Sequence, residues 1–283
     1  MKQITACIDG SHGAEAVCHA SAWLSARLQM PLALMHVLEK PESPDTNMSG
    51  SIGLGSREHL LQQLTELDEQ RSKLALQHGS LMLEAAKELV EGRGAVDVST
   101  VQRHGRLPDA VLEVQEATSV LVMGRQGEDH NDPEVASVGT NFETVLRSVS
   151  CPVLVTPGTF PEPKSFMIAY DGSEAAERIM DVYPKSPLLK GLQCHLIMVN
   201  ADSPQRVKLH SAGDRLREAG FRVHEEHLEG TDVRTTLMRY QAQHKIDLIV
   251  MGAYGHSRMR SFFLGSHTRD MVAHTPIPLL LLR

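Results

Sequence analysis

Short apolar runs alternate with amphipathic segments along the first part of the chain. The runs are rich in Val, Ile and Leu, which is typical of buried parallel strands, and the segments between them place apolar residues at helical spacing. These patterns predict strands over 4–8, 32–37, 96–101, 120–123 and 153–156, and helices over 13–28, 108–116 and 141–148. Strands that alternate with helices predict a parallel sheet with right-handed crossovers and helices on both faces.

The same pattern occurs twice. Blocks of the first part recur in the second part in the same order: 4–11 with 166–173, 36–37 with 198–199, 122–124 with 250–252, 138–140 with 264–266, and 151–155 with 277–281. Repeated blocks in a conserved order indicate a duplicated unit. We therefore predict a first domain over 1–156, a proline-rich linker over 157–165 and a second domain over 166–283.

The first domain carries an insertion over about 41–92 that is longer than the matching part of the second domain. Its polar Pro-, Ser- and Gly-rich start predicts a mobile loop, and a long helix is expected from Ser56 to about Val90, bent or broken at Gly79. An apolar stripe follows that helix: Leu60, Leu64, Leu67, Leu74, Met82, Ala85, Ala86 and Leu89. The stripe either packs against its own sheet or forms a surface for a partner or for the second domain.

The overall composition is that of a globular protein. The chain has 283 residues, of which 41% are hydrophobic and 22% charged, and a net charge of −7. This charge disfavours binding to nucleic acid or to acidic membranes. No apolar run reaches the roughly 18 residues of a membrane span, and the N-terminus does not resemble a secretory signal. The four cysteines are scattered, as free thiols in a reducing compartment are. We expect a cytoplasmic protein.

A glycine-rich stretch follows a run over 246–250 that is predicted to be a buried strand. It has the spacing Gly252-x2-Gly255-x9-Gly265-Ser266 and precedes a predicted helix. Glycine lets backbone N–H groups approach a phosphate, and Ser266 can both cap the helix and contact an anion. Positive charge can come from His256, Arg258, Arg260 and His267. A strand-to-helix connection with conveniently placed glycines is the alternative interpretation of the spacing.

This spacing resembles the ATP-binding motif of the universal stress protein (UspA) family, and the resemblance spans nearly the whole chain outside 41–92. It implies an α/β fold with two tandem Rossmann-like domains (adenine nucleotide alpha hydrolase-like), each a five-stranded parallel sheet of order 3-2-1-4-5. Single-domain members dimerise through their last strand. The resemblance therefore implies an intramolecular pseudo-dimer in which 153–156 pairs with 278–282, and an apolar edge strand needs such a partner. A homodimer of the whole chain is left open.

The resemblance also implies roles for residues of the second domain. Asp171 would contact the adenine and ribose end of ATP, although it can equally well cap the next helix together with Ser173. The backbone of Val199 would hold the adenine. The ribose and phosphates would be contacted by Gly252, Gly255, Gly265, Ser266, His267 and Thr268. Tyr254 departs from the His or Arg frequent at its position. A Mg²⁺ ion would be held mainly by ATP, since no carboxylate cage is evident.

The first domain matches the motif less well. The matching residues are Asp9, Val37, Gly124, Gly127, Gly139 and Thr140, but two extra residues separate the last two glycines. That stretch contains Glu128, Asp129, Asp132 and Glu134. Carboxylates repel a triphosphate, so we expect ATP in the second domain and a degenerate or different site in the first.

No catalytic residue can be named from the sequence. There is no Walker lysine after a glycine loop and no G-x-S-x-G elbow. The resemblance implies a nucleotide binder in stress response or signalling rather than a fast enzyme. The alternatives are a nucleotide-free scaffold, a slow ATPase, and an enzyme of the wider adenine nucleotide alpha hydrolase superfamily.

Overall fold

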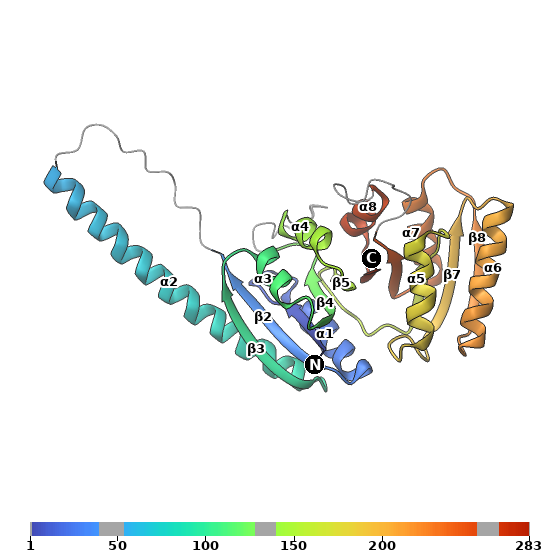
Figure 1. Cartoon of the computed structure of the whole chain (residues 1–283), viewed down its shortest axis with the longest axis horizontal. Coiled ribbons are helices and arrows are strands. Elements are labelled where there is room, and N and C mark those ends of the chain that lie inside the picture. The colour runs from blue at the N-terminus through green and yellow to red at the C-terminus, as the bar shows by residue number, and fades with distance from the viewer. Residues whose placement is uncertain (1, 40–53, 128–139, 254–265, 283) are drawn as a thin grey trace.

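The computed structural model of the protein describes residues 2–39, 54–127, 140–253 and 266–282 (Figure 1). In these ranges ten strands form one sheet: β1 (Gln3–Cys7), β2 (Pro31–Leu38), β3 (Val96–His104), β4 (Thr118–Gly124), β5 (Val153–Thr156), β6 (Ser165–Ala169), β7 (Gln193–Val199), β8 (Val223–Leu228), β9 (Leu248–Gly252) and β10 (Leu279–Leu282). The helices are α1 (Ala14–Leu28), α2 (Leu54–Glu91), α3 (Leu107–Val114), α4 (Thr140–Ser148), α5 (Glu174–Val182), α6 (Ser203–Glu218), α7 (Val233–His244) and α8 (Ser266–His274).

The sheet consists of two parallel halves joined edge to edge. Its strand order is β3-β2-β1-β4-β5-β10-β9-β6-β7-β8, so β1 to β5 and β6 to β10 each follow the order 3-2-1-4-5. Where the halves meet, β5 and β10 are antiparallel, with Leu154 opposite Leu280. The expected pairing of the two last strands is therefore confirmed. It gives each apolar last strand a hydrogen-bonded neighbour on both sides, which removes an exposed edge.

Helices cover both faces of the sheet, as expected. One buried cluster joins the sheet to α1, α2, α5 and α6, and a second cluster on the other face joins it to α3, α4, α7 and α8. The first cluster continues through both halves of the chain. Between them, Phe160 of the connecting segment packs against Trp23 of α1, with ring centroids 5.7 Å apart. The halves thus share buried apolar surface beyond the strand pair.

The predicted strands and helices are present, with small shifts at their ends. One of these shifts has a clear physical cause. The strand β9 begins at Leu248, whereas the predicted strand began at Ile246. The carboxylate of Asp247 accepts hydrogen bonds from the backbone N–H of Lys164 (2.9 Å) and of Ser165 (3.0 Å). Asp247 therefore closes the start of β6 and does not extend β9.

The insertion forms α2, an α-helix of 38 residues that is unbroken at Gly79. The expected break there is wrong, and the expected bend stays a prediction. A Cβ atom added at Gly79 would lie 2.6 Å from the His36 ring and would also meet the Gln102 side chain. The glycine instead lets α2 approach β2 and β3 closely.

Only the C-terminal part of α2 packs on the sheet. Leu83, Ala86 and Val90 are buried, and Met82 and Leu89 are partly buried. The interpretation of the whole stripe as core is wrong for its earlier members, because Leu64, Leu67 and Leu74 are exposed, as is Ala85. Figure 1 shows that the N-terminal part of α2 extends away from the sheet.

Candidate functional site

In the second half, three predicted site residues meet at one edge of the sheet. The strand β6 lies between β7 and β9, and all three are parallel, so their carboxyl ends are adjacent. Asp171 follows β6, Val199 ends β7 and Gly252 ends β9. Chain order reverses between β6 and β9, and ligands of open α/β sheets bind at such a point.

Asp171 begins a tight turn into α5. Its Oδ1 accepts a hydrogen bond from the Ser173 N–H (2.9 Å), and Gly172 has a φ of +71°, which glycine adopts without strain. Ser173 then caps α5, because its Oγ accepts from the Ala176 N–H at 3.2 Å. The capping role that the sequence left open thus falls mainly to Ser173, while the half-buried Asp171 carboxylate shapes the turn.

Asn200, which the sequence analysis missed, fixes the loop after β7. It has a φ of +57°. Its side-chain Nδ2 donates a hydrogen bond to the Gly230 carbonyl (2.6 Å), and its Oδ1 accepts one from the Gly230 N–H (3.0 Å). This pair of bonds holds the end of β7 against the loop after β8. An asparagine directly after a predicted strand, where left-handed backbone is common, was the available indication.

The first turn of α8 is tied to the end of β9. Thr268 is buried, and its Oγ1 donates a hydrogen bond to the Ala253 carbonyl (3.0 Å). This bond brings the N-terminus of α8, which includes Ser266 and His267, to the same edge as Gly252. The N–H groups of a first helical turn have no partner within the helix and attract anions. In this arrangement the Thr268 hydroxyl positions the helix.

Gly252 also has a packing reason to be glycine. A Cβ atom at this position would lie 2.7 Å from the Cβ of Ala175 in α5. The motif residues Gly255, His256, Arg258 and Gly265 lie outside the described residues, as do the side chains of Ser266 and His267. Their roles stay predictions.

A lysine that the sequence analysis did not select lies beside the Asp171 turn. The Lys208 side chain of α6 approaches Gly172, with its Cδ 3.4 Å and its Nζ 4.0 Å from where a Cβ of that glycine would be. This places a cation next to the predicted ribose end of the site. From the sequence alone, Lys208 is one of several charged residues on an amphipathic helix.

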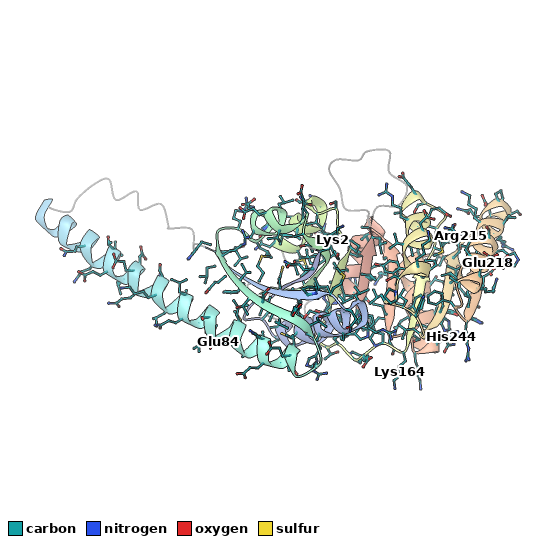
Figure 2. All side chains as sticks on the ribbon, turned by 60° about the horizontal axis from the view of Figure 1, so that its bottom comes forward. Lys2, Glu84, Lys164, Arg215, Glu218 and His244 are labelled. Atoms are coloured by element: carbon teal, nitrogen blue, oxygen red, sulfur yellow. The ribbon has the colours of Figure 1, made fainter. Side chains whose placement is uncertain are left out.

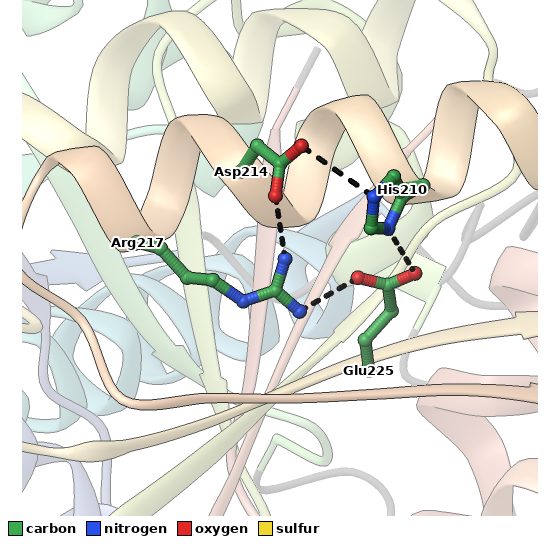
Figure 3. A network of polar contacts seen from close by, with 4 residues as sticks. All are labelled: His210, Asp214, Arg217 and Glu225. Atoms are coloured by element: carbon green, nitrogen blue, oxygen red, sulfur yellow. Dashed lines mark hydrogen bonds and ion pairs between the residues drawn. The ribbon is translucent and has the colours of Figure 1, made fainter.

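Figure 3 shows how α6 is held to β8 by a charged network. Arg217 contacts Asp214 and Glu225, both at 2.8 Å, and His210 contacts the same two carboxylates at 3.6 and 3.3 Å. The Glu225 carboxylate lies against Gly213, where a Cβ atom would collide with it. Apart from Glu225 the members of this network are largely exposed, so each of its contacts contributes little to stability.

The equivalent edge of the first half also gathers its predicted residues. Asp9 follows β1, Val37 lies near the end of β2 and Gly124 ends β4. The Asp9 Oδ1 accepts from the Ser11 N–H (3.1 Å) and Oγ (2.5 Å), and its Oδ2 lies 3.6 Å from where a Cβ of Gly127 would be. Gly139 and the Thr140 side chain lie outside the described residues.

Comparison with known proteins places the chain in a family. The model of the universal stress protein family matches residues 1–157 and 198–283. Universal stress protein Slr1230 of Synechocystis is 34% identical over 289 residues, which cover 100% of both chains. The chain belongs to the universal stress protein family.

Other members agree with the duplicated architecture. A universal stress protein of Thermus aquaticus is 31% identical over 137 residues, which cover 98% of that protein but 42% of this tandem chain. The solved structure of a universal stress protein from Archaeoglobus fulgidus has the same fold, with a TM-score of 0.68 and 16% identity over 100% of this chain and 97% of that one.

Two contacts distinguish the first universal stress protein unit from the second. Glu39 Oε1 accepts hydrogen bonds from the Leu107 N–H at the start of α3 (3.1 Å) and from Asn141 Nδ2 at the start of α4 (3.0 Å). A carboxylate therefore occupies the place beside these helix N-termini. In the second unit, the position that aligns with Glu39 is the buried Ala201. The start of α7 there has a carboxylate of its own, because Asp232 accepts a hydrogen bond from the Thr235 N–H at 2.7 Å, so the difference between the units concerns the start of α4.

The arginine of the first glycine loop serves the contact between the two units. Arg125 Nη1 donates to the carbonyls of Ala273 (3.1 Å) and Thr275 (3.0 Å) at the C-terminal end of α8. Burial lowers the pKa of the Arg125 guanidinium from its usual value. Its hydrogen bonds to a helix C-terminus are favourable, since the carbonyls there carry negative partial charge. Within the described residues, Arg125 therefore has a structural role: it joins the two units.

The described residues contain no group of three His, Cys, Asp or Glu side chains that could hold a metal ion. Among the same residues, no helix is both long enough and apolar enough to cross a bilayer.

Proposed function

We propose that this universal stress protein binds ATP or a related adenine nucleotide at the carboxyl edge of β6, β7 and β9. The observation that carries the proposal is the convergence of Asp171, Val199 and Gly252 with the N-terminus of α8. Membership of the family supports a role in stress response. We infer that the nucleotide acts there as a signal and not as the substrate of a fast enzyme.

The chemistry of the edge suits the parts of such a nucleotide. A half-buried carboxylate at Asp171 can accept hydrogen bonds from ribose hydroxyls, and the backbone at Val199 can pair with the adenine edge. The first turn of α8 offers N–H groups to the phosphates. Lys208, next to the Asp171 turn, adds a cation at this edge. Any Mg²⁺ would be held mainly by the phosphates of ATP.

The asymmetry between the units supports one nucleotide site. We take 1–156 and 166–283 as domains joined by a linker over 157–165, acting in the cytoplasm. In the first domain Glu39 places a negative charge where phosphates would approach the start of α4. Two like charges about 4 Å apart repel by about 1 kcal/mol in water and about 4 kcal/mol near a protein surface. The second domain has an uncharged Ala201 at the aligned position.

Isothermal titration calorimetry of the full chain with ATP and Mg²⁺ tests this proposal. We expect one ATP per chain, weaker binding in Asp171→Asn, and unchanged binding in the matched first-domain variant Asp9→Asn. Equal loss in both variants, or two equivalent sites, would contradict the assignment to the second domain. Absence of binding would favour the scaffold, and ADP accumulating in the sample would favour the slow ATPase.

A further inference from the structure

The helix α2 carries a line of exposed leucines at intervals of seven residues. Leu67, Leu74 and Leu81 are 56%, 65% and 65% exposed, and Leu64, next to this line, is 41% exposed. In the sequence, Leu60 continues the same interval. Leucines seven residues apart, with a second position between them, are the pattern by which two helices pair as a coiled coil.

The leucine line cannot be covered by the sheet of its own chain. The residues that pack α2 on the sheet are Gly79, Leu83, Ala86 and Val90. Leu81 is two residues from Gly79, which is about 200° around a helix, so it points away from the sheet. Figure 1 and Figure 2 show the N-terminal part of α2 standing clear of the rest of the chain. Helices in proteins owe most of their stability to a packed face, and among the residues that the structure describes this part of α2 has none from its own chain.

We propose that α2 pairs with α2 of a second copy of this chain as an antiparallel coiled coil centred near Glu69. The leucine line of each copy forms the seam. This interface lies on the opposite side of α2 from its own sheet, and it does not depend on the nucleotide site.

Charge selects the antiparallel orientation. Arg71 lies in the seam, between Leu67 and Leu74 at the second heptad position. In a parallel pair in register, each Arg71 would face the other inside an apolar seam, where two cations repel. In the antiparallel pair, Leu64 faces the second copy's Leu74, and Arg71 lies beside the second copy's Asp68. Each cation then meets a carboxylate, once on either side of the centre.

One flank of the leucine line is compatible with this pairing. On the other flank the two Asp68 carboxylates come near each other, and each is offset by Arg71 of the other copy. The residues that flank the leucines on one side are Gln63, Gln70 and Gln77, also at intervals of seven. They carry no charge that would repel the same side of a second copy. The C-terminal part of α2 is packed on its own sheet, so an antiparallel pair places the two sheets at opposite ends of the coiled coil. No globular part then obstructs the seam.

The oligomeric state of the full chain tests the pairing. Sedimentation equilibrium at micromolar concentration should show a dimer for the natural chain and a monomer for the double variant Leu67→Glu, Leu74→Glu. Val207→Glu is the matched control, because Val207 is 71% exposed on α6, and it should stay dimeric. All substituted side chains are exposed, and a cooperative urea transition at an unchanged midpoint will show that the domains of the variants fold, even where the unpaired part of α2 loses helicity. A monomeric natural chain, or a dimeric double variant, would overturn the proposal.

Cysteine cross-linking tests the orientation. When Leu64→Cys and Leu74→Cys proteins are mixed under mild oxidation, we expect a disulfide between the two different chains. Leu74→Cys alone should give no more cross-linking than the natural chain, whose own cysteines set the background. Efficient cross-linking of Leu74→Cys to itself is the outcome of a parallel pair and would overturn the antiparallel proposal.

Discussion

Replacing Gly252 by alanine tests whether this motif glycine is required by packing. The added Cβ would lie 2.7 Å from the Ala175 Cβ, and 3.5 and 3.6 Å from the Ala175 backbone carbon and Cα. Carbon atoms in favourable contact are about 3.5–4.0 Å apart, so the shortfall is roughly 1 Å. Either the start of α5 or the end of β9 must move. The backbone at Gly252 is outside the left-handed region, so alanine adds no dihedral strain.

The expected loss in the free energy of unfolding is about 1–2 kcal/mol. Overfilling a packed site costs about 1–3 kcal/mol. Part of this is offset, because alanine has less conformational freedom than glycine in the unfolded chain, which is worth about 0.4–1 kcal/mol. The matched control is Gly124→Ala in the first unit, where the Cβ would meet Val17 at an ordinary 3.8 Å and the Gln126 carbonyl at a tighter 3.2 Å. We expect its loss to be smaller by about 1 kcal/mol.

Urea unfolding followed by circular dichroism, without nucleotide, measures both variants. Because no ligand is present, a loss of stability in Gly252→Ala reports packing and not phosphate binding. If Gly252→Ala and Gly124→Ala are equally stable, the packing explanation of Gly252 is wrong.

Three further predictions concern contacts far apart in the sequence, and each is measured by urea unfolding. Arg125→Met removes two hydrogen bonds from a charged donor to the other unit, and we expect a loss of about 1–3 kcal/mol; an unchanged midpoint would show that these bonds do not join the units. Gly79→Val should cost about 2–3 kcal/mol, because its Cβ would overlap His36; retained stability would mean that α2 can shift freely. The pKa of His195 is lowered mainly by burial and further by the neighbouring His224 and His244 rings. As pH falls, the imidazole of residue 195 is therefore protonated in the unfolded chain before it is protonated in the folded chain. Stability should therefore fall from about pH 6.5 downward, and His195→Gln should make that fall shallower; an identical slope would contradict the assignment.

Much of the fold follows from local pattern. The strand over 153–156 and the helices ending at Leu28 and Ser148 were predicted at the observed residues. Repeated blocks in one order also indicated two similar units. This works because burial on one face leaves a period in the sequence, and a duplicated chain leaves the same period twice.

The candidate site was predicted only in outline. The motif indicated Asp171, Val199 and Gly252, and the sheet brings them to one edge. It could not indicate Asn200, whose amide bonds a loop thirty residues away, or Lys208, which reaches the Asp171 turn from α6. Such contacts depend on which strands are neighbours, and strand order leaves no trace in periodicity.

What the sequence determined by itself is therefore the set of elements, their duplication and the identity of the glycine motif. The tertiary structure alone decided that Gly79 brings a helix to the sheet, that Arg125 joins the two units, and that the leucines of α2 are left exposed. The physical reason is that periodicity records whether a face is apolar. What that face meets depends on how distant segments are arranged in space.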